Sequence, residues 1–262
     1  FDPTAVRAWL EVWNAVNADY FRAAGLEPLT PDVALTQPHL AAQPLLLFML
    51  ACYDADGNAL RRTPGPLGHA ELYERLMTRF AIRALEQRPP ADQVPRLAER
   101  ELLRLSFAAA SMINRGRQWA TTEEVDADLD VLLPEQRRTP GLAGPRGSAH
   151  QALARSFFVH RARAVRDDEV LHTYEFLHAT FGEFLIARLL AALMRELVAQ
   201  ESSLALTGVH DGLLRTLLSW AALSSRLPVV SFLRELSRGA DGWRAMLLRL
   251  FRELDARDDT AI

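Results

Sequence analysis

The sequence contains no lysine, and all 30 of its basic residues are arginines. Phosphate loops of the Walker A type need a lysine on the β- and γ-phosphates, and Schiff-base enzymes need one as the nucleophile. The sequence also lacks a Gly-rich loop after a strand, a Cys/His cluster with zinc spacing and a G-x-S-x-G nucleophile elbow. No complete catalytic constellation remains, so we expect neither catalytic residues, nor a metal site, nor ATP hydrolysis by this chain alone.

Cysteine is almost as rare, because Cys52 is the only one. A single cysteine excludes an internal disulfide and is typical of a reducing compartment, which favours a cytoplasmic protein. The longest apolar run, residues 41–52, is too short to cross a bilayer, so we expect no membrane partner. There is no signal peptide. The first residue is Phe1 rather than methionine, which favours a piece of a longer protein.

The remaining composition is that of an ordinary globular protein. The chain has 262 residues, of which 49% are hydrophobic and 24% charged, enough for one large or two small domains. Its formal net charge of −3 gives no general reason to expect nucleic acid as a partner.

A change of period marks residues 172–190, HTYEFLHATFGEFLIARLL. Tyr174, Phe176 and His178 alternate with other residues, which predicts a strand. After Thr180 the apolar residues follow a helical stripe, and Thr180 and Glu183 have the spacing of a capping box. His178 is therefore expected where a strand ends and a helix begins, beside backbone N–H groups that favour an anion. A histidine that only packs at this corner is the competing interpretation.

The first third of the chain predicts helices. Asp2 and Pro3 predict a helix start, and Gly25 predicts the end of that same helix. Pro44 lacks a backbone N–H, so it either begins a new helix or kinks one, and the apolar run after it is typical of a buried helix. The D-x-D-G-N string at residues 54–58 is interpreted as a turn, because the final glutamate of a calcium loop is missing.

The middle of the chain predicts a winged-helix order, three helices followed by a β-hairpin. The expected helices are residues 92–114, 121–133 and 149–155, and the expected strands are residues 157–164 and 171–177. Residues 134–148 are rich in Pro, Gly and Arg, so we expect a mobile loop that proteases cut first, at Arg137, Arg138 or Arg146. Three more helical segments are expected at residues 209–223, 229–237 and 243–254.

Several of these segments resemble a known family. The string Tyr174-x-Phe176-x-His178-x-x-Phe181-x-Glu183-Phe184-x-x-Ala187 is similar to the F-x-H-x-x-F-x-E-F-x-A-A signature of the NACHT-type STAND ATPases, which include the NOD-like receptors. The run LAAQPLLLFMLACYDADGNAL resembles the segment of their first helical domain with a G-x-P or n-P-L-L motif, although Ala42 replaces the glycine. The string ELYERLMTRFA follows in the same order, and the resemblance covers residues 40–192.

The resemblance implies a nucleotide-binding role for two residues, Pro44 against the adenine and His178 on the β-phosphate of ADP. It also implies that ADP or ATP, with Mg²⁺, is held by a Walker core that precedes Phe1, so that this core is the partner of the present chain. In the family, ADP keeps the switch closed, and exchange for ATP allows homo-oligomerisation and signalling. Bacterial members are associated with defence against phage.

The expected fold class is mainly α, a helical bundle plus a winged-helix domain with one β-hairpin, followed by α-solenoid-like helices. The expected domains are a helical lid over residues 1–88, a winged-helix domain over residues 89–201 and the start of a helical arm over residues 202–262. Within this architecture, the function expected from the resemblance is regulation of a nucleotide-dependent signalling switch.

Two other functions fit the same fold. A DNA-binding winged-helix regulator would use the arginines of its third helix and wing, namely Arg146, Arg155, Arg161, Arg163 and Arg166. The acidic residues 167–169 at the hairpin tip argue against phosphate contact, so nucleic acid is not the expected partner. A helical scaffold without any ligand would leave Pro44 and His178 with packing roles only.

Overall fold

The chain forms two compact units, Phe1–Phe80 and Ala81–Ile262, and each is described by itself. The computed structural model describes residues 1–62, 65, 67–85, 89–132, 153, 156, 158–166, 169–202, 211–219, 225–240 and 242–258. The division falls within a helix and sets no boundary between separately folded domains. The limits predicted after residues 88 and 201 therefore stay predictions.

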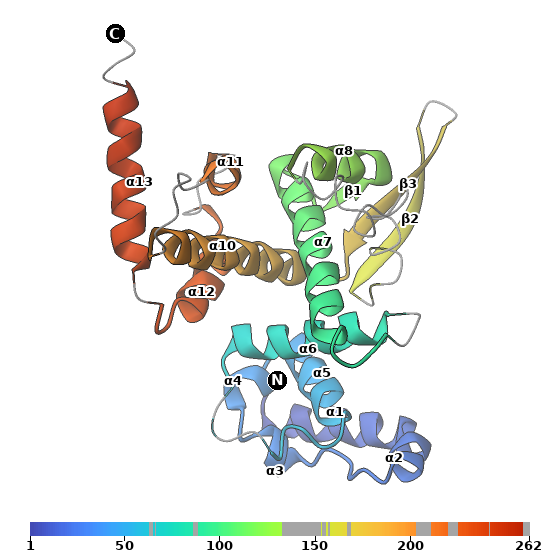
Figure 1. Cartoon of the computed structure of the whole chain (residues 1–262). Coiled ribbons are helices and arrows are strands. Elements are labelled where there is room, and N and C mark those ends of the chain that lie inside the picture. Colours follow the sequence, from blue (N-terminus) through green and yellow to red (C-terminus); the bar gives the residue numbers. More distant parts are fainter. Residues whose placement is uncertain are drawn as a thin grey trace. The chain divides into compact units, whose positions relative to one another are not determined.

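The first unit is helical (Figure 1). Its helices are α1 (Pro3–Val16), α2 (Ala18–Ala24), α3 (Pro31–Ala34), α4 (Pro38–Ala41), α5 (Pro44–Asp54) and most of α6 (His69–Arg83). Leu10 from α1, Phe21 from α2 and Leu47 and Leu50 from α5 are buried together with Leu72 of α6. Four of these helices start on a proline at their first position, where the missing N–H costs nothing.

The helix predicted to run from Pro3 to the residue before Gly25 is interrupted, so that prediction is wrong at one point. Asn17 leaves the helical region, with φ −102° and ψ 12°, and separates α1 from α2. Its side-chain amide donates a 2.8 Å hydrogen bond to the Trp13 carbonyl oxygen. Asparagine competes for backbone groups in this way, which explains a break that the apolar stripe does not reveal. Gly25 does cap α2, with φ 62°.

The turn predicted at residues 54–58 forms after α5, and side chains hold it. The buried carboxylate of Asp54 accepts a 3.2 Å hydrogen bond from the Leu60 N–H. Asn58, with φ 53°, donates 2.7 Å to the Glu27 carbonyl oxygen and accepts 3.1 Å from the Glu27 N–H. Burial raises the pKa of Asp54, although Asn58 and Arg61 partly offset it.

The second unit combines helices with a small antiparallel sheet. Its elements are α7 (Val94–Asn114), β1 (Trp119–Thr121), α8 (Thr122–Leu132), β2 (Val159–Arg166), β3 (Glu169–Phe176), α10 (Ala179–Ser202), α11 (Gly212–Ser219), α12 (Leu227–Leu236) and α13 (Trp243–Asp258). The mainly helical class with one hairpin is thereby confirmed. The expected loop at residues 134–148, with its proteolysis sites Arg137, Arg138 and Arg146, lies outside the described residues.

The sheet has the strand order β1-β3-β2. The predicted hairpin pairs Val159 with Phe176 at one end and Arg166 with Glu169 at the other. β1 was not predicted, because three residues are too few to show a period of two. It pairs antiparallel with the other edge of β3, so the described residues have the order helix, strand, helix, hairpin. The winged-helix domain stays a prediction. The expected third helix lies outside those residues except for Leu153.

α10 is the central helix of the second unit, and it packs against α7, α11, α12 and α13 (Figure 1). Apolar residues are buried around most of its circumference, among them Phe181, Phe184, Leu185 and Leu189. The Phe184 ring meets the Phe232 ring of α12 edge-on, with centroids 5.4 Å apart. A helix buried on several sides explains why its apolar pattern is broader than a single stripe.

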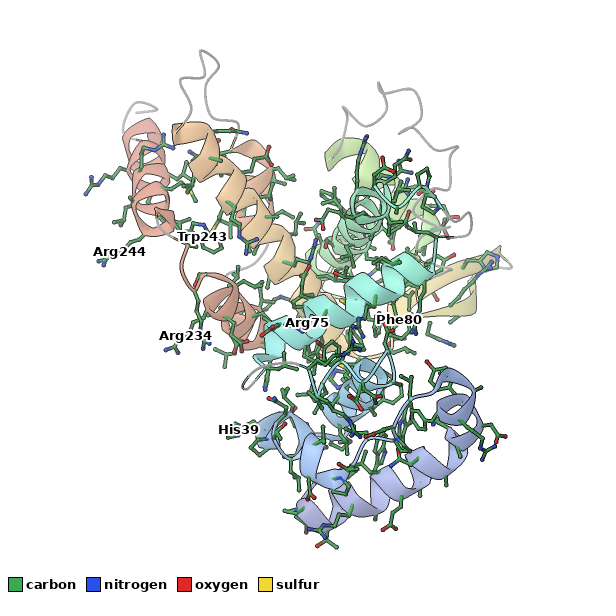
Figure 2. All side chains as sticks on the ribbon, turned by 60° about the horizontal axis from the view of Figure 1, so that its bottom comes forward. His39, Arg75, Phe80, Arg234, Trp243 and Arg244 are labelled. Atoms are coloured by element: carbon green, nitrogen blue, oxygen red, sulfur yellow. The ribbon has the colours of Figure 1, made fainter. Side chains whose placement is uncertain are left out.

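At the start of α13 a buried side chain is followed directly by an exposed one (Figure 2). Trp243 is buried, and the Arg195 guanidinium of α10 lies 5.8 Å from its ring centroid. The next residue, Arg244, is exposed. Among the described residues, no helix is long and apolar enough to cross a membrane.

Candidate functional site

His178 lies at the predicted corner between strand and helix. β3 ends at Phe176 and α10 begins at Ala179, so His178 immediately precedes the first turn of the helix. Tyr174 and Phe176 point into the core, whereas His178 is exposed. The side-chain alternation of the strand therefore ends before His178. The exposed ring does not pack in the core, whereas a structural role at this corner, as a helix cap, and a nucleotide contact both fit the position.

The imidazole of His178 caps the helix through one of its two nitrogens. Nδ1 accepts a 3.3 Å hydrogen bond from the Thr180 N–H and lies 2.8 Å from the Thr180 hydroxyl oxygen. Because an accepting Nδ1 carries no proton, the neutral ring holds its proton on Nε2. Nε2 has no hydrogen-bond partner within the described part of the chain. An exposed N–H donor is therefore fixed at the start of the helix, where the Thr180 and Phe181 N–H groups already donate to His178.

The predicted capping box at Thr180 and Glu183 is wrong. Thr180 is the second residue of α10, so it lies inside the helix that it was expected to cap. The capping side chain is His178, one residue before the helix starts. A histidine is not among the preferred capping residues, which is why the Thr-x-x-Glu spacing was the stronger signal.

Pro44 occupies the first position of α5 and is exposed. Of the two predicted possibilities, a helix start and a kink, the structure shows the start. The N-cap residue, Gln43, makes no side-chain capping bond to the helix. Pro44 belongs to the first unit and His178 to the second, and each is described within its own unit.

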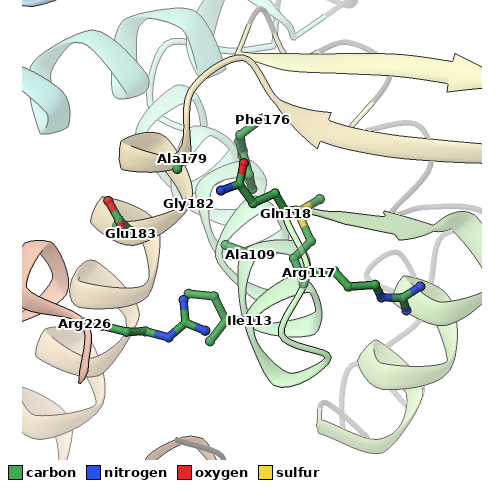
Figure 3. Close-up of a pocket in the computed structure, with 10 residues that line it drawn as sticks. Ala109, Ile113, Arg117, Gln118, Phe176, Ala179, Gly182, Glu183 and Arg226 are labelled. Carbon is green, nitrogen blue, oxygen red and sulfur yellow. The ribbon is translucent and has the colours of Figure 1, made fainter. Parts of the chain in front are cut away.

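A pocket opens beside the first turn of α10, entirely within the second unit (Figure 3). Its empty space is about 450 Å³ when the open solvent at its mouth is included. The lining comes from α7, the segment after it, the end of β3, α10 and the residue before α12: Ala109, Met112, Ile113, Arg117, Gln118, Phe176, Ala179, Gly182, Glu183 and Arg226. Sequence patterns gave no sign of this pocket, because its residues come from five separate segments.

Gly182 allows β3 and α10 to approach each other closely at this pocket. A Cβ atom on Gly182 would lie 3.2 Å from Cδ2 of the Phe176 ring, closer than ordinary van der Waals contact. The ring can therefore lie against the helix backbone and form part of the pocket wall. A larger residue at position 182 would displace it.

Two charged groups of the pocket have no ion-pair partner among the described residues. Glu183 and Arg226 are both half-buried, and within the described residues no hydrogen bond or ion pair engages either side chain. Burial raises the pKa of Glu183, and the charges of Arg226 and His178 offset this only in part. A carboxylate in such a position is poorly solvated and is stabilised by any cation that approaches it.

Arg117, the second arginine of the pocket, is already engaged elsewhere. Its guanidinium lies 4.0 Å from the Trp119 ring centroid and 2.5 Å from the Glu124 carboxylate of α8. Figure 3 shows it turned away from Glu183 and Arg226. Burial opposes ionisation of Glu124, but hydrogen bonds from Thr121 and Arg117 and the charges of Arg117 and Arg115 outweigh it and lower the pKa. Arg226 is therefore the available cation of the pocket.

Only some of the arginines expected for a DNA-binding winged helix lie among the described residues. Arg161 on β2 is exposed and lies 3.0 Å from Nδ1 of His172 on β3. Arg146 and Arg155 fall outside the described residues, as do the side chains of Arg163 and Arg166. Nothing in the described part of the hairpin favours phosphate binding over a solvated face. A search of the described residues for three or more His, Cys, Asp or Glu side chains that could hold a metal ion finds none.

Comparison with family models, curated proteins and solved structures finds no match to this chain.

Proposed function

We propose that this chain is the regulatory part of a nucleotide-dependent signalling switch of the NACHT type. In this proposal a nucleotide-binding core earlier in the same protein holds ADP or ATP with Mg²⁺. The present chain closes over the nucleotide and controls oligomerisation. The support is the motif resemblance together with the geometry at His178.

The single observation that carries the proposal is the exposed imidazole at the start of α10. Nδ1 is engaged with Thr180, which fixes the ring, while Nε2 is unengaged among the described residues. Helix N-termini favour anions through their free N–H groups and the helix dipole. A fixed N–H donor at this place is suited to a phosphate oxygen, which is the contact that the resemblance implies.

Pro44 supports the proposal more weakly. It is exposed at the start of an otherwise buried helix, and an apolar ring there offers a flat surface to a nucleobase. In the proposal Pro44 contacts the base and His178 contacts the phosphate. Loss of either contact would then favour the open state, because binding and closure are linked.

The nucleotide content of the parent protein tests the proposal. The protein that contains this chain and its upstream core would be purified, denatured and analysed by anion-exchange chromatography for released nucleotide. We expect ADP at close to one per protein, and a Walker A and Walker B pair in the sequence before Phe1. A parent protein without bound nucleotide and without these motifs would leave the helical scaffold as the better description.

A further inference from the structure

The pocket beside the first turn of α10 combines an apolar floor with charges of both signs. Ala109, Met112, Ile113 and Phe176 supply the apolar surface. Glu183 and Arg226 supply an anion and a cation. Binding sites for small molecules have this composition, a mostly apolar wall with a few polar groups that fix orientation.

The two charges do not neutralise each other. No ion pair joins Glu183 to Arg226 in the described part of the chain, and the charge of Arg226 offsets only part of the rise in the Glu183 pKa that burial causes. Half-buried charges without close partners lose hydration and gain little in return. A ligand with a cationic group for Glu183 and an anionic group for Arg226 would compensate both at once.

We propose that this pocket binds a small zwitterion with an apolar side chain, of which hydrophobic α-amino acids are the simplest examples. The ammonium group contacts Glu183, the carboxylate contacts Arg226, and the side chain lies on the floor formed by Met112, Ile113 and Phe176. Arg117 takes no part, because Glu124 and Trp119 already engage it. This proposal does not rest on the nucleotide switch, since its residues are neither Pro44 nor His178.

The ligand would connect three elements that meet at the pocket. Ile113 lies near the end of α7, Glu183 lies in the second turn of α10, and Arg226 immediately precedes α12. The α12 helix does not depend on Arg226 for its start, because this N-cap residue makes no side-chain capping bond. Replacing Arg226 should therefore remove a ligand contact without unfolding the helix.

Isothermal titration calorimetry of the 262-residue chain with L-leucine tests the proposal. Two probes keep the apolar part and remove one charge each, isocaproate without the amine and isoamylamine without the carboxylate. We expect saturable binding of leucine and at least tenfold weaker binding of both analogues. Each lost charge-assisted contact removes one of the two interactions that distinguish the zwitterion.

Four variants assign the contacts. Glu183→Gln and Arg226→Gln should each weaken leucine binding at least tenfold. Glu196→Gln on the same helix and Arg238→Ala beyond α12, both at exposed positions, should leave it unchanged. Circular dichroism establishes that each variant is folded before titration. The proposal is overturned if leucine does not bind, if either analogue binds as well as leucine, or if the two pocket variants bind leucine like the unaltered chain.

Discussion

At the scale of single residues, the structure assigns the capping of α10 and the lining of the pocket to different residues from those that the sequence pattern indicated. Thr180 and Glu183 were expected to cap α10, but His178 does so through Nδ1. Glu183 instead lines the pocket as a half-buried carboxylate. The stretch from His178 to Glu183 therefore presents an exposed N–H donor and, within two helical turns, an acid without a close cation among the described residues.

Glu183 should make stability depend on pH. Burial raises its pKa in the folded protein, so between the unfolded and folded values the native state binds more protons than the unfolded chain. The free energy of unfolding then falls as the pH rises through that window and stays lower above it. Glu183→Gln removes this loss and should be more stable than the unaltered chain at pH 7, with the difference vanishing below about pH 4.

Denaturant melts at several pH values measure this difference directly. Glu196→Gln is the matched control, because Glu196 is exposed on the same helix. A Glu183→Gln chain that is less stable than the unaltered chain at pH 7 would show that the carboxylate has a stabilising partner in the fold. A difference in the free energy of unfolding that is the same at every pH would likewise contradict the prediction.

At the scale of elements, the sequence predicted those with a long, regular period. The apolar repeat of α7, the alternation of β2 and β3 and the proline at the start of α5 are local signals, and all four elements form. The helix break at Asn17 was missed because a single side-chain hydrogen bond causes it. β1 was missed because it forms only by pairing with β3, which is distant in the sequence. The pocket at Glu183 was missed for the same reason, since only the fold brings α7 and Arg226 beside it.

A capping box does form in this unit, at the start of α8, between Thr121 before the helix and Glu124 in its first turn. The Thr121 N–H donates 3.0 Å to the Glu124 carboxylate, and the Glu124 N–H donates 3.2 Å to the Thr121 hydroxyl. Glu124→Ala removes half of the box and the partner of Arg117. We expect a loss of about 1–3 kcal/mol in the free energy of unfolding.

The exposed neighbour Glu123 provides the comparison, because it also lies in the first turn of α8 and makes no such box. Glu123→Ala should cost no more than about 0.3–1 kcal/mol, the usual contribution of an acid near a helix N-terminus. Urea titration at pH 7 measures both values. Equal losses in the two variants would mean that helix charge, and not the capping box, stabilises α8.

At the scale of the whole molecule, our proposal assigns nucleotide binding and hydrolysis to another part of the protein and regulation to this chain. It has no lysine for a phosphate loop, and no metal-binding cluster occurs among the described residues. The two candidate nucleotide contacts lie in separate units. Both are exposed, as the proposed contacts to a nucleotide require.

The isolated chain should therefore show no ATP turnover. Phosphate release would be measured across the fractions of a gel-filtration run, so that a contaminating ATPase elutes apart from the chain. Turnover that follows the monomer peak in every fraction would refute the proposed division between a catalytic core and a regulatory part.

The most direct test of the nucleotide switch is the ADP content of the parent protein with changes at His178. His178→Ser keeps an oxygen that can cap Thr180 and removes the Nε2 donor, whereas His178→Ala removes both. A hydrogen bond to a charged phosphate contributes about 1.5–3 kcal/mol. We therefore expect both variants to lose ADP about ten- to a hundred-fold more readily and to oligomerise without a trigger. Only His178→Ala should lower the melting temperature of the present chain. If His178→Ser retains ADP like the unaltered protein, His178 is a helix cap and the central claim is wrong.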